Sequence, residues 1–151
     1  MRKGKRVVRF APDGQFALRI EGETLRHYPD TDRLEIERVR IHAVAPDGRT
    51  TDATAQRALA NGDGSEVQLL GGAQVRSLLS SGETLEVESE FLQGFLRFER
   101  LRSHLPVRVR RGASETRAGG LDYDNLGQQL QLTGPVRASL LPVPRRTGPA
   151  R

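Results

Sequence analysis

Apolar and polar side chains alternate along much of this chain, and this period of two residues limits what the chain can fold into. Phe16, Leu18 and Ile20 are separated by Ala17 and Arg19. The alternation recurs in later segments, at 34–36, 39–41, 85–91, 107–110, 130–133 and 136–140. Successive side chains of a strand point to opposite faces of a sheet, so each run predicts a half-buried strand. Clusters of Pro, Gly, Asp and Asn separate the runs, which indicates an antiparallel all-β fold.

Two segments are less regular. Residues 52–60 are rich in Ala but also alternate, and Asn61-Gly62 follows them directly. We interpret this segment as a strand rather than a helix, because so early a stop leaves little room for a helix. The stretch 91–105 mixes apolar spacings and predicts no single element.

A weak internal repeat adds to the strand pattern. Residues 63–75 resemble 125–136, and 28–36 is a looser third copy. Each copy predicts a turn, a strand with two inward apolar residues, a break and another strand. Units that cannot bury an apolar face alone must stack on their neighbours.

The chain has 151 residues, enough for one domain with its own core. We expect this domain to span 6–141, between a basic arm at 1–5 and a disordered Pro/Arg-rich tail at 142–151. The absence of Cys excludes disulfides, thiolate metal sites and a Cys nucleophile. No segment is apolar enough for a transmembrane helix, and Met1–Arg9 does not lead into the apolar region of a signal peptide.

Catalytic motifs do not stand out. The three His residues lack the spacing of a zinc site, and no Ser stands in a G-x-S-x-G pattern. The carboxylate pairs Asp30/Asp32 and Asp122/Asp124 lie in predicted turns, where such groups most often accept backbone hydrogen bonds. We therefore expect no enzymatic activity, no metal and no cofactor.

The charge distribution argues against a nucleic-acid partner despite a net charge of +5. Residues 10–99 carry nine Arg and sixteen Asp or Glu, so the positive charge lies at the chain ends and in 100–118. Arg108, Arg110 and Arg111 have no aromatic residue between them, whereas single-stranded nucleic acids are held by aromatic side chains among cations. We expect no nucleic-acid partner.

Two motifs carry a resemblance to a known family. HYPD at 27–30 and the part of a closing segment at 120–142 that runs from Y-D-N to G-P-V-R are the most specific. Further segments at 10–41, 60–75, 85–92 and 104–112 match in order. The chain resembles the LptC family of the lipopolysaccharide export bridge. The residues that match its motifs are His27, Tyr28, Pro29, Asp30, Tyr123, Asp124, Asn125 and Gly134.

The resemblance implies an open, twisted antiparallel β-jelly roll of two sheets, with roughly 12–15 short strands. It implies a periplasmic, inner-membrane-associated component that receives lipopolysaccharide from the jelly-roll domains of the inner-membrane ABC transporter and passes it to the bridge protein LptA. The family's transmembrane anchor is expected to be absent from this chain, because Met1–Arg9 is too short and too basic. A soluble subunit like LptA is the nearest alternative within this fold.

In such a jelly roll, the inward apolar residues form a groove for acyl chains. We expect the groove to contain Phe16, Leu18, Leu34, Ile36, Val67, Leu69, Leu85, Val87, Leu130 and Leu132. Edge strands template pairing with other chains. The expected protein-interface edges are Val7, Val8, Arg9 and Phe10 at one end, and Val136, Arg137, Ala138, Ser139 and Leu140 at the other.

Other interpretations stay open at this point. The inward residues are also what the core of a plain β-sandwich scaffold would need, and an Arg-rich nucleic-acid binder is the third alternative. Arg108, Arg110 and Arg111 are expected on a solvated outer face rather than against lipid A phosphates.

Overall fold

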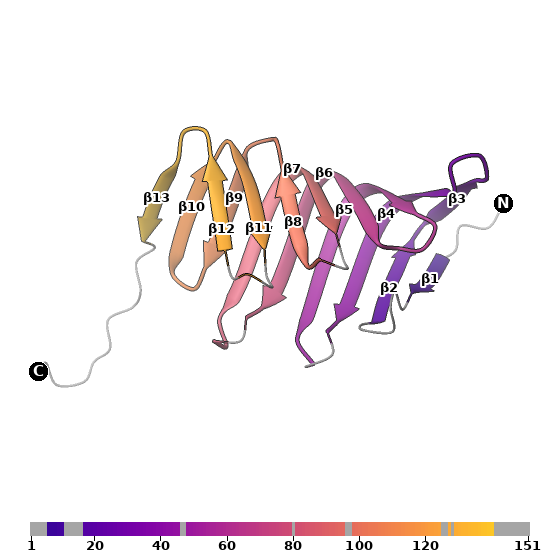
Figure 1. Cartoon of the computed structure of the whole chain (residues 1–151), viewed down its shortest axis with the longest axis horizontal. Helices are drawn as coiled ribbons and strands as arrows, with labels where there is room; N and C mark the ends of the chain where they lie inside the picture. The colour runs from indigo at the N-terminus through magenta and orange to yellow at the C-terminus, as the bar shows by residue number, and fades with distance from the viewer. Residues whose placement is uncertain are drawn as a thin grey trace, which may run out of the picture.

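The computed structural model describes residues 6–10, 17–45, 48–79, 81–95, 98–124, 127 and 129–140, without the side chains of 6–10 and 140. Among these residues, thirteen strands form one antiparallel sheet that folds back over itself (Figure 1). The strands are β1 (Arg6–Phe10), β2 (Ala17–Gly22), β3 (Thr24–Tyr28), β4 (Arg33–Val44), β5 (Thr50–Asn61), β6 (Glu66–Leu78), β7 (Thr84–Phe95), β8 (Arg100–Ser103), β9 (Val107–Arg111), β10 (Ser114–Ala118), β11 (Gly120–Asp124), β12 (Gln129–Thr133) and β13 (Arg137–Leu140). The all-β, open antiparallel architecture predicted from the sequence is confirmed.

The four long strands β4–β7 belong to two layers at once. The C-terminal half of β4 pairs with β2, whereas its N-terminal half pairs with β3. β7 divides in the same way, between β9 over 85–89 and β8 over 93–95. In Figure 1, β8, β11 and β12 pass in front of the layer that contains β7, β9 and β10.

We call these layers the two half-sheets. The first contains β1, β2, β9, β10, β13, the C-terminal halves of β4 and β6, and the N-terminal halves of β5 and β7. The second contains β3, β8, β11, β12 and the remaining halves of the long strands. The two sheets predicted from the sequence are therefore one sheet bent along a line through β4–β7.

Local backbone irregularities produce the bend. Arg38 in β4 has a φ of 52°, and Gly71 and Gly72 in β6 have φ values of 81° and 57°. The β5–β6 register shifts between Thr54 and Arg57, and the β6–β7 register shifts beside the two glycines. Bulges of this kind insert a residue and sharpen the local twist.

The bend changes which residues face inward. In β4 the buried positions run from Leu34 and Ile36 to Val39 and Ile41, so the alternation slips by one residue at Arg38. β7 slips similarly, from Val87 to Leu92. Both half-sheets can therefore bury apolar side chains against each other, and one long strand looks like two short ones in the sequence.

Several sequence expectations are settled by this fold. The interpretation of 52–60 as a strand is confirmed by β5. The irregular stretch 91–105 contains the end of β7, a turn and β8. The predicted arm at 1–5 and tail at 142–151 lie outside the described residues. β3, β10 and β11 were not evident as separate strands, because 24–28 and 114–118 are largely polar and 120–124 is short.

Two connections between the half-sheets touch at a pair of glycines. Gly119 joins β10 to β11, and its amide donates a hydrogen bond to the Thr133 carbonyl at 2.7 Å. Gly134 joins β12 to β13 with a φ of 77°, and a Cβ there would lie 3.1 Å from the Gly119 Cα. A Cβ on either glycine would lie closer to the other connection than ordinary van der Waals contact allows.

We predict that Gly134→Ala destabilises the protein more than Gly82→Ala does. Both positions have positive φ, which costs a residue with a Cβ about 1–2 kcal/mol. Only Gly134 also faces a backbone contact, because nothing lies within 4 Å of a Cβ at Gly82. Urea unfolding followed by circular dichroism measures the difference. Equal losses in the free energy of unfolding would contradict the close approach at Gly119.

Candidate functional site

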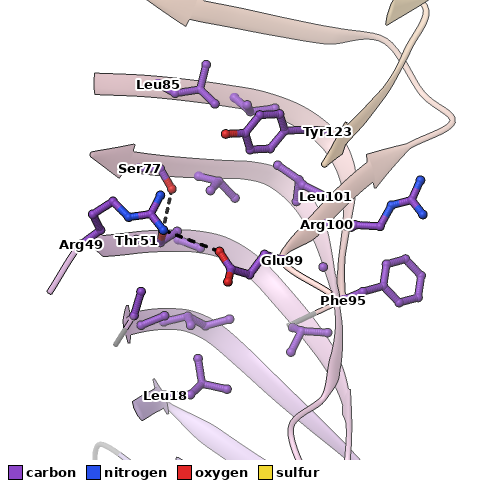
Figure 2. Close-up of a pocket in the computed structure, with 18 of the residues that line it drawn as sticks. Leu18, Arg49, Thr51, Ser77, Leu85, Phe95, Glu99, Arg100, Leu101 and Tyr123 are labelled. Carbon is purple, nitrogen blue, oxygen red and sulfur yellow. Dashed lines mark hydrogen bonds and ion pairs between the residues drawn. The ribbon is translucent and has the colours of Figure 1, made fainter. Parts of the chain in front are cut away.

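An open cavity of about 170 Å³ lies between the half-sheets, and Figure 2 shows residues that line it. Its walls are mainly aliphatic. The first half-sheet contributes Leu18, Ile41, Ala53, Val75, Leu85 and Val87, and the second contributes Val67, Leu69, Leu101 and Tyr123. Both layers therefore present apolar side chains to the same space.

Small side chains leave this space unfilled. Ala43 and Ala53 line the cavity from β4 and β5, and Gly94 lines it from β7. β5 also places Ala58 and Ala60 inward, with both buried. Protein cores normally pack without voids larger than a water molecule. Ala43, Ala53 and Gly94 therefore leave part of the space between the half-sheets open, whereas Ala58 and Ala60 are packed outside the cavity lining.

The groove residues expected from the sequence fall into four groups, and Leu130 alone forms the fourth. Seven residues are buried. Five of them line the cavity, namely Leu18, Val67, Leu69, Leu85 and Val87, and the other two, Leu34 and Ile36, are buried outside its lining. Leu132 is half-buried and packs against the core. Phe16 lies outside the described residues.

Leu130, expected in the interior of the groove, is exposed at 44% of its surface and is not buried there. Its predicted face is consistent with the register. Leu130 pairs with Tyr123, and Leu132 pairs with the buried Leu121. Directly opposed residues lie on the same face, so Leu130 shares the inner face with Tyr123. β12 is the last strand of its half-sheet, and no further strand covers it among the described residues.

The family-motif residues do not form one site. Tyr123 lines the cavity. Asp124 accepts a hydrogen bond from the Gly127 amide at 3.1 Å and so holds the β11–β12 turn. His27 contacts Asp32 at 2.8 Å, and the Tyr28 hydroxyl donates to Glu35 at 2.7 Å. Pro29 and Asp30 lie in the exposed β3–β4 turn, Gly134 lies at the glycine crossing, and Asn125 is outside the described residues.

Charged side chains stand at the mouth of the cavity. Arg49 Nη2 lies 3.9 Å from Glu99 Oε1, and both residues line the opening (Figure 2). Burial raises the pKa of the Tyr123 phenol above its ordinary value, and the nearby Arg49 charge partly opposes that rise. Sequence analysis did not find Arg49 or Glu99, because they are far apart in the chain and stand in no motif.

The Arg cluster of β9 is engaged by carboxylates. Arg108 pairs with Glu88, Arg110 pairs with Glu115 at 3.2 Å, and Arg111 pairs with Glu83 at 3.1 Å. The hydrogen bond from Arg110 holds the pKa of Glu115 below its ordinary value. Arg108 and Arg110 alternate with the buried Val107 and Val109, so they lie on the outer face, away from the cavity.

The two predicted interface edges are edge strands. β1 pairs only with β2, and β13 pairs only with β10 among the described strands. Within β13, Arg137, Ala138 and Ser139 are exposed, as is Val136 just before it. The outer sides of both strands are therefore free of a partner strand within the described part of the chain.

Other kinds of site are not evident in what the structure describes. No group of three His, Cys, Asp or Glu residues within the described ranges could hold a metal ion. Asp122 pairs with Arg100 at 3.0 Å and with Arg102 at 3.6 Å, rather than with a turn backbone as expected. In the same part of the chain, no helix is long and apolar enough to cross a membrane.

Comparisons with known proteins agree with this architecture. No curated protein sequence matches the chain. The crystal structure of LptH, the LptA-homologous periplasmic component of the lipopolysaccharide transport device from Pseudomonas aeruginosa, is similar with a TM-score of 0.69. That similarity covers 83% of this chain and 95% of LptH at 11% sequence identity, so it shows a shared fold. The profile of the family "Lipopolysaccharide-assembly, LptC-related" matches residues 3–141. This chain therefore belongs to the LptC-related family of lipopolysaccharide-assembly proteins.

Proposed function

We propose that this protein is a non-enzymatic module of the lipopolysaccharide export bridge that holds acyl chains of lipopolysaccharide between its half-sheets. It acts in the periplasm, in association with the inner membrane. It receives the lipid from the jelly-roll domains of the inner-membrane ABC transporter and passes it to the periplasmic bridge protein LptA. The observation that carries this proposal is the aliphatic cavity between the two half-sheets, whose walls include small residues that leave it open.

The chemistry of the cavity suits a lipid in transit. Burying a methylene group contributes about 0.8 kcal/mol, so part of one acyl chain is enough for useful binding. Leu18, Val67, Leu69, Leu85 and Val87 line the cavity, and their side chains offer no directional contacts. An acyl chain can therefore slide along these walls without breaking specific bonds.

The open end of the inner face supports transfer to a neighbour. Leu130 and Val136 are 44% and 49% exposed near the C-terminal end of the sheet. Leu130 belongs to the edge strand β12 and Val136 directly precedes the edge strand β13, and exposed strand edges pair readily with another chain. We propose that LptA adds a strand beside β13 and extends the apolar face, and that β1 pairs with a transporter domain at the other end.

We predict that a photo-crosslinking residue at position 75 labels lipopolysaccharide and that one at position 74 does not. Val75 lines the cavity, whereas the neighbouring Gln74 in β6 is exposed on the opposite face. Gel mobility and mass spectrometry of the cross-linked product measure the labelling. Equal labelling at both positions, or none in a folded protein, would favour a scaffold that makes only protein contacts.

We predict that deletion of 135–151 abolishes capture of LptA in a pull-down. This deletion removes β13, whereas deletion of 142–151 leaves it intact and is the matched control. The control variant should capture LptA as the full chain does, because strand addition uses the backbone of β13. Circular dichroism checks that both variants fold. Undiminished capture by the longer deletion would refute the assignment of this edge.

A further inference from the structure

Arg49 and Glu99 come from opposite sides of the cavity mouth. Arg49 directly precedes β5, where β4 and β5 meet at the free rim of the first half-sheet. Glu99 directly precedes β8, at the free rim of the second half-sheet, beside the end of β7. Their side chains meet across the opening, as Figure 2 shows. The ion pair therefore connects the two rims over the apolar space.

The Arg49–Glu99 ion pair is long and only partly exposed. The 3.9 Å separation exceeds the 2.7–2.9 Å of a charge-assisted hydrogen bond. The side chains are only 27% and 25% exposed, so their interaction is weakly screened by water. A guanidinium presents a planar fork of donors that matches phosphate oxygens. A phosphate is therefore a chemically suitable ligand for the Arg49 guanidinium at the mouth.

The backbone of Glu99 has a conformation that it shares with Asp32 and Arg38 among the described residues other than glycine. Glu99 has a φ of 48°, in the left-handed region that residues with a Cβ seldom adopt. Such conformations persist where the surrounding structure holds them, often at ligand-binding sites. Here the conformation occurs in the residue that places a carboxylate beside Arg49.

We propose that Arg49 recognises the phosphate of an anionic lipid headgroup, and that Glu99 holds the guanidinium at the mouth until the phosphate replaces its carboxylate. Breaking the ion pair releases the contact between the rims while the acyl chains enter below. This inference rests on the proposed function, because it requires acyl chains in the cavity. It assigns the mouth, rather than the Arg cluster of β9, to the headgroup.

The test compares two lipids that share their acyl chains. Bisphosphorylated lipid A and its dephosphorylated form compete with a fluorescent fatty acid for the protein. The unaltered protein should prefer the phosphorylated lipid by about tenfold, the effect of one hydrogen bond between charged groups. Arg49→Gln should bring the affinity ratio close to one. Glu99→Gln should raise the ratio, because it removes the competing charge, and it tests the proposal even where Arg49→Gln fails to fold.

Arg57→Gln is the matched control. Arg57 forms a similar cross-strand pair with Glu35 at 3.6 Å. Its position lies on the outer face of β5, because the alternate residues Ala58 and Ala60 face inward. This variant should keep the ratio of the unaltered protein. A loss of preference in Arg57→Gln as large as in Arg49→Gln would overturn the inference, because the effect would then come from net charge.

The remaining outcomes separate this inference from the proposed function. A preference that survives Arg49→Gln, or one that Glu99→Gln leaves unchanged, overturns the role of the mouth while lipid binding stands. Binding of neither lipid by the folded protein overturns both. Inorganic phosphate in large excess should not displace phosphorylated lipid A, because it lacks acyl chains. Displacement by inorganic phosphate would make Arg49 a general anion site and overturn the assignment to a lipid headgroup.

Discussion

The bend shared by β4–β7 is the constraint on which the rest of the structure depends. Because these strands belong to both half-sheets, the two layers are joined through continuous backbone rather than by side-chain packing alone. The register shifts and the Gly71-Gly72 pair let each layer present apolar residues inward. Because a bulge inserts a residue, constant alternation through it would turn the apolar residues of one half outward. The cavity therefore follows from backbone geometry before any lipid is considered.

Joining the layers through the backbone also allows the interior to stay partly empty. Ala53 and Gly94 face a space that larger side chains would fill, and an unfilled apolar space costs stability in an ordinary core. In this architecture the layers are held by strand pairing along the bend, so the opposite side can remain open. That side carries Arg49 and Glu99, which connect the rims without filling the gap between them.

The sequence predicted the strands well where the alternation was clear. It predicted burial and contacts less well where these depend on which strands become neighbours in the fold. Leu34 and Ile36 were assigned to the correct face, but their continuity with Val39 and Ile41 in β4 was hidden by the slip at Arg38. The exposure of Leu130 depends on β12 being the last strand of its layer, which alternation does not reveal. The Arg49–Glu99 pair joins loops that only the bend brings together.

The central claim is that acyl chains occupy the space between the half-sheets, and methyl NMR tests it most directly on the unaltered protein. Leu69, Val75 and Leu85 line the cavity, whereas Leu59 and Leu70 alternate with buried inward residues and lie on the outer face. With lipid A added, intermolecular nuclear Overhauser effects from acyl methylenes should appear at the first three methyl groups and be absent at the other two. Effects at the outer methyl groups alone, or at neither set while lipid A binds, would contradict the account.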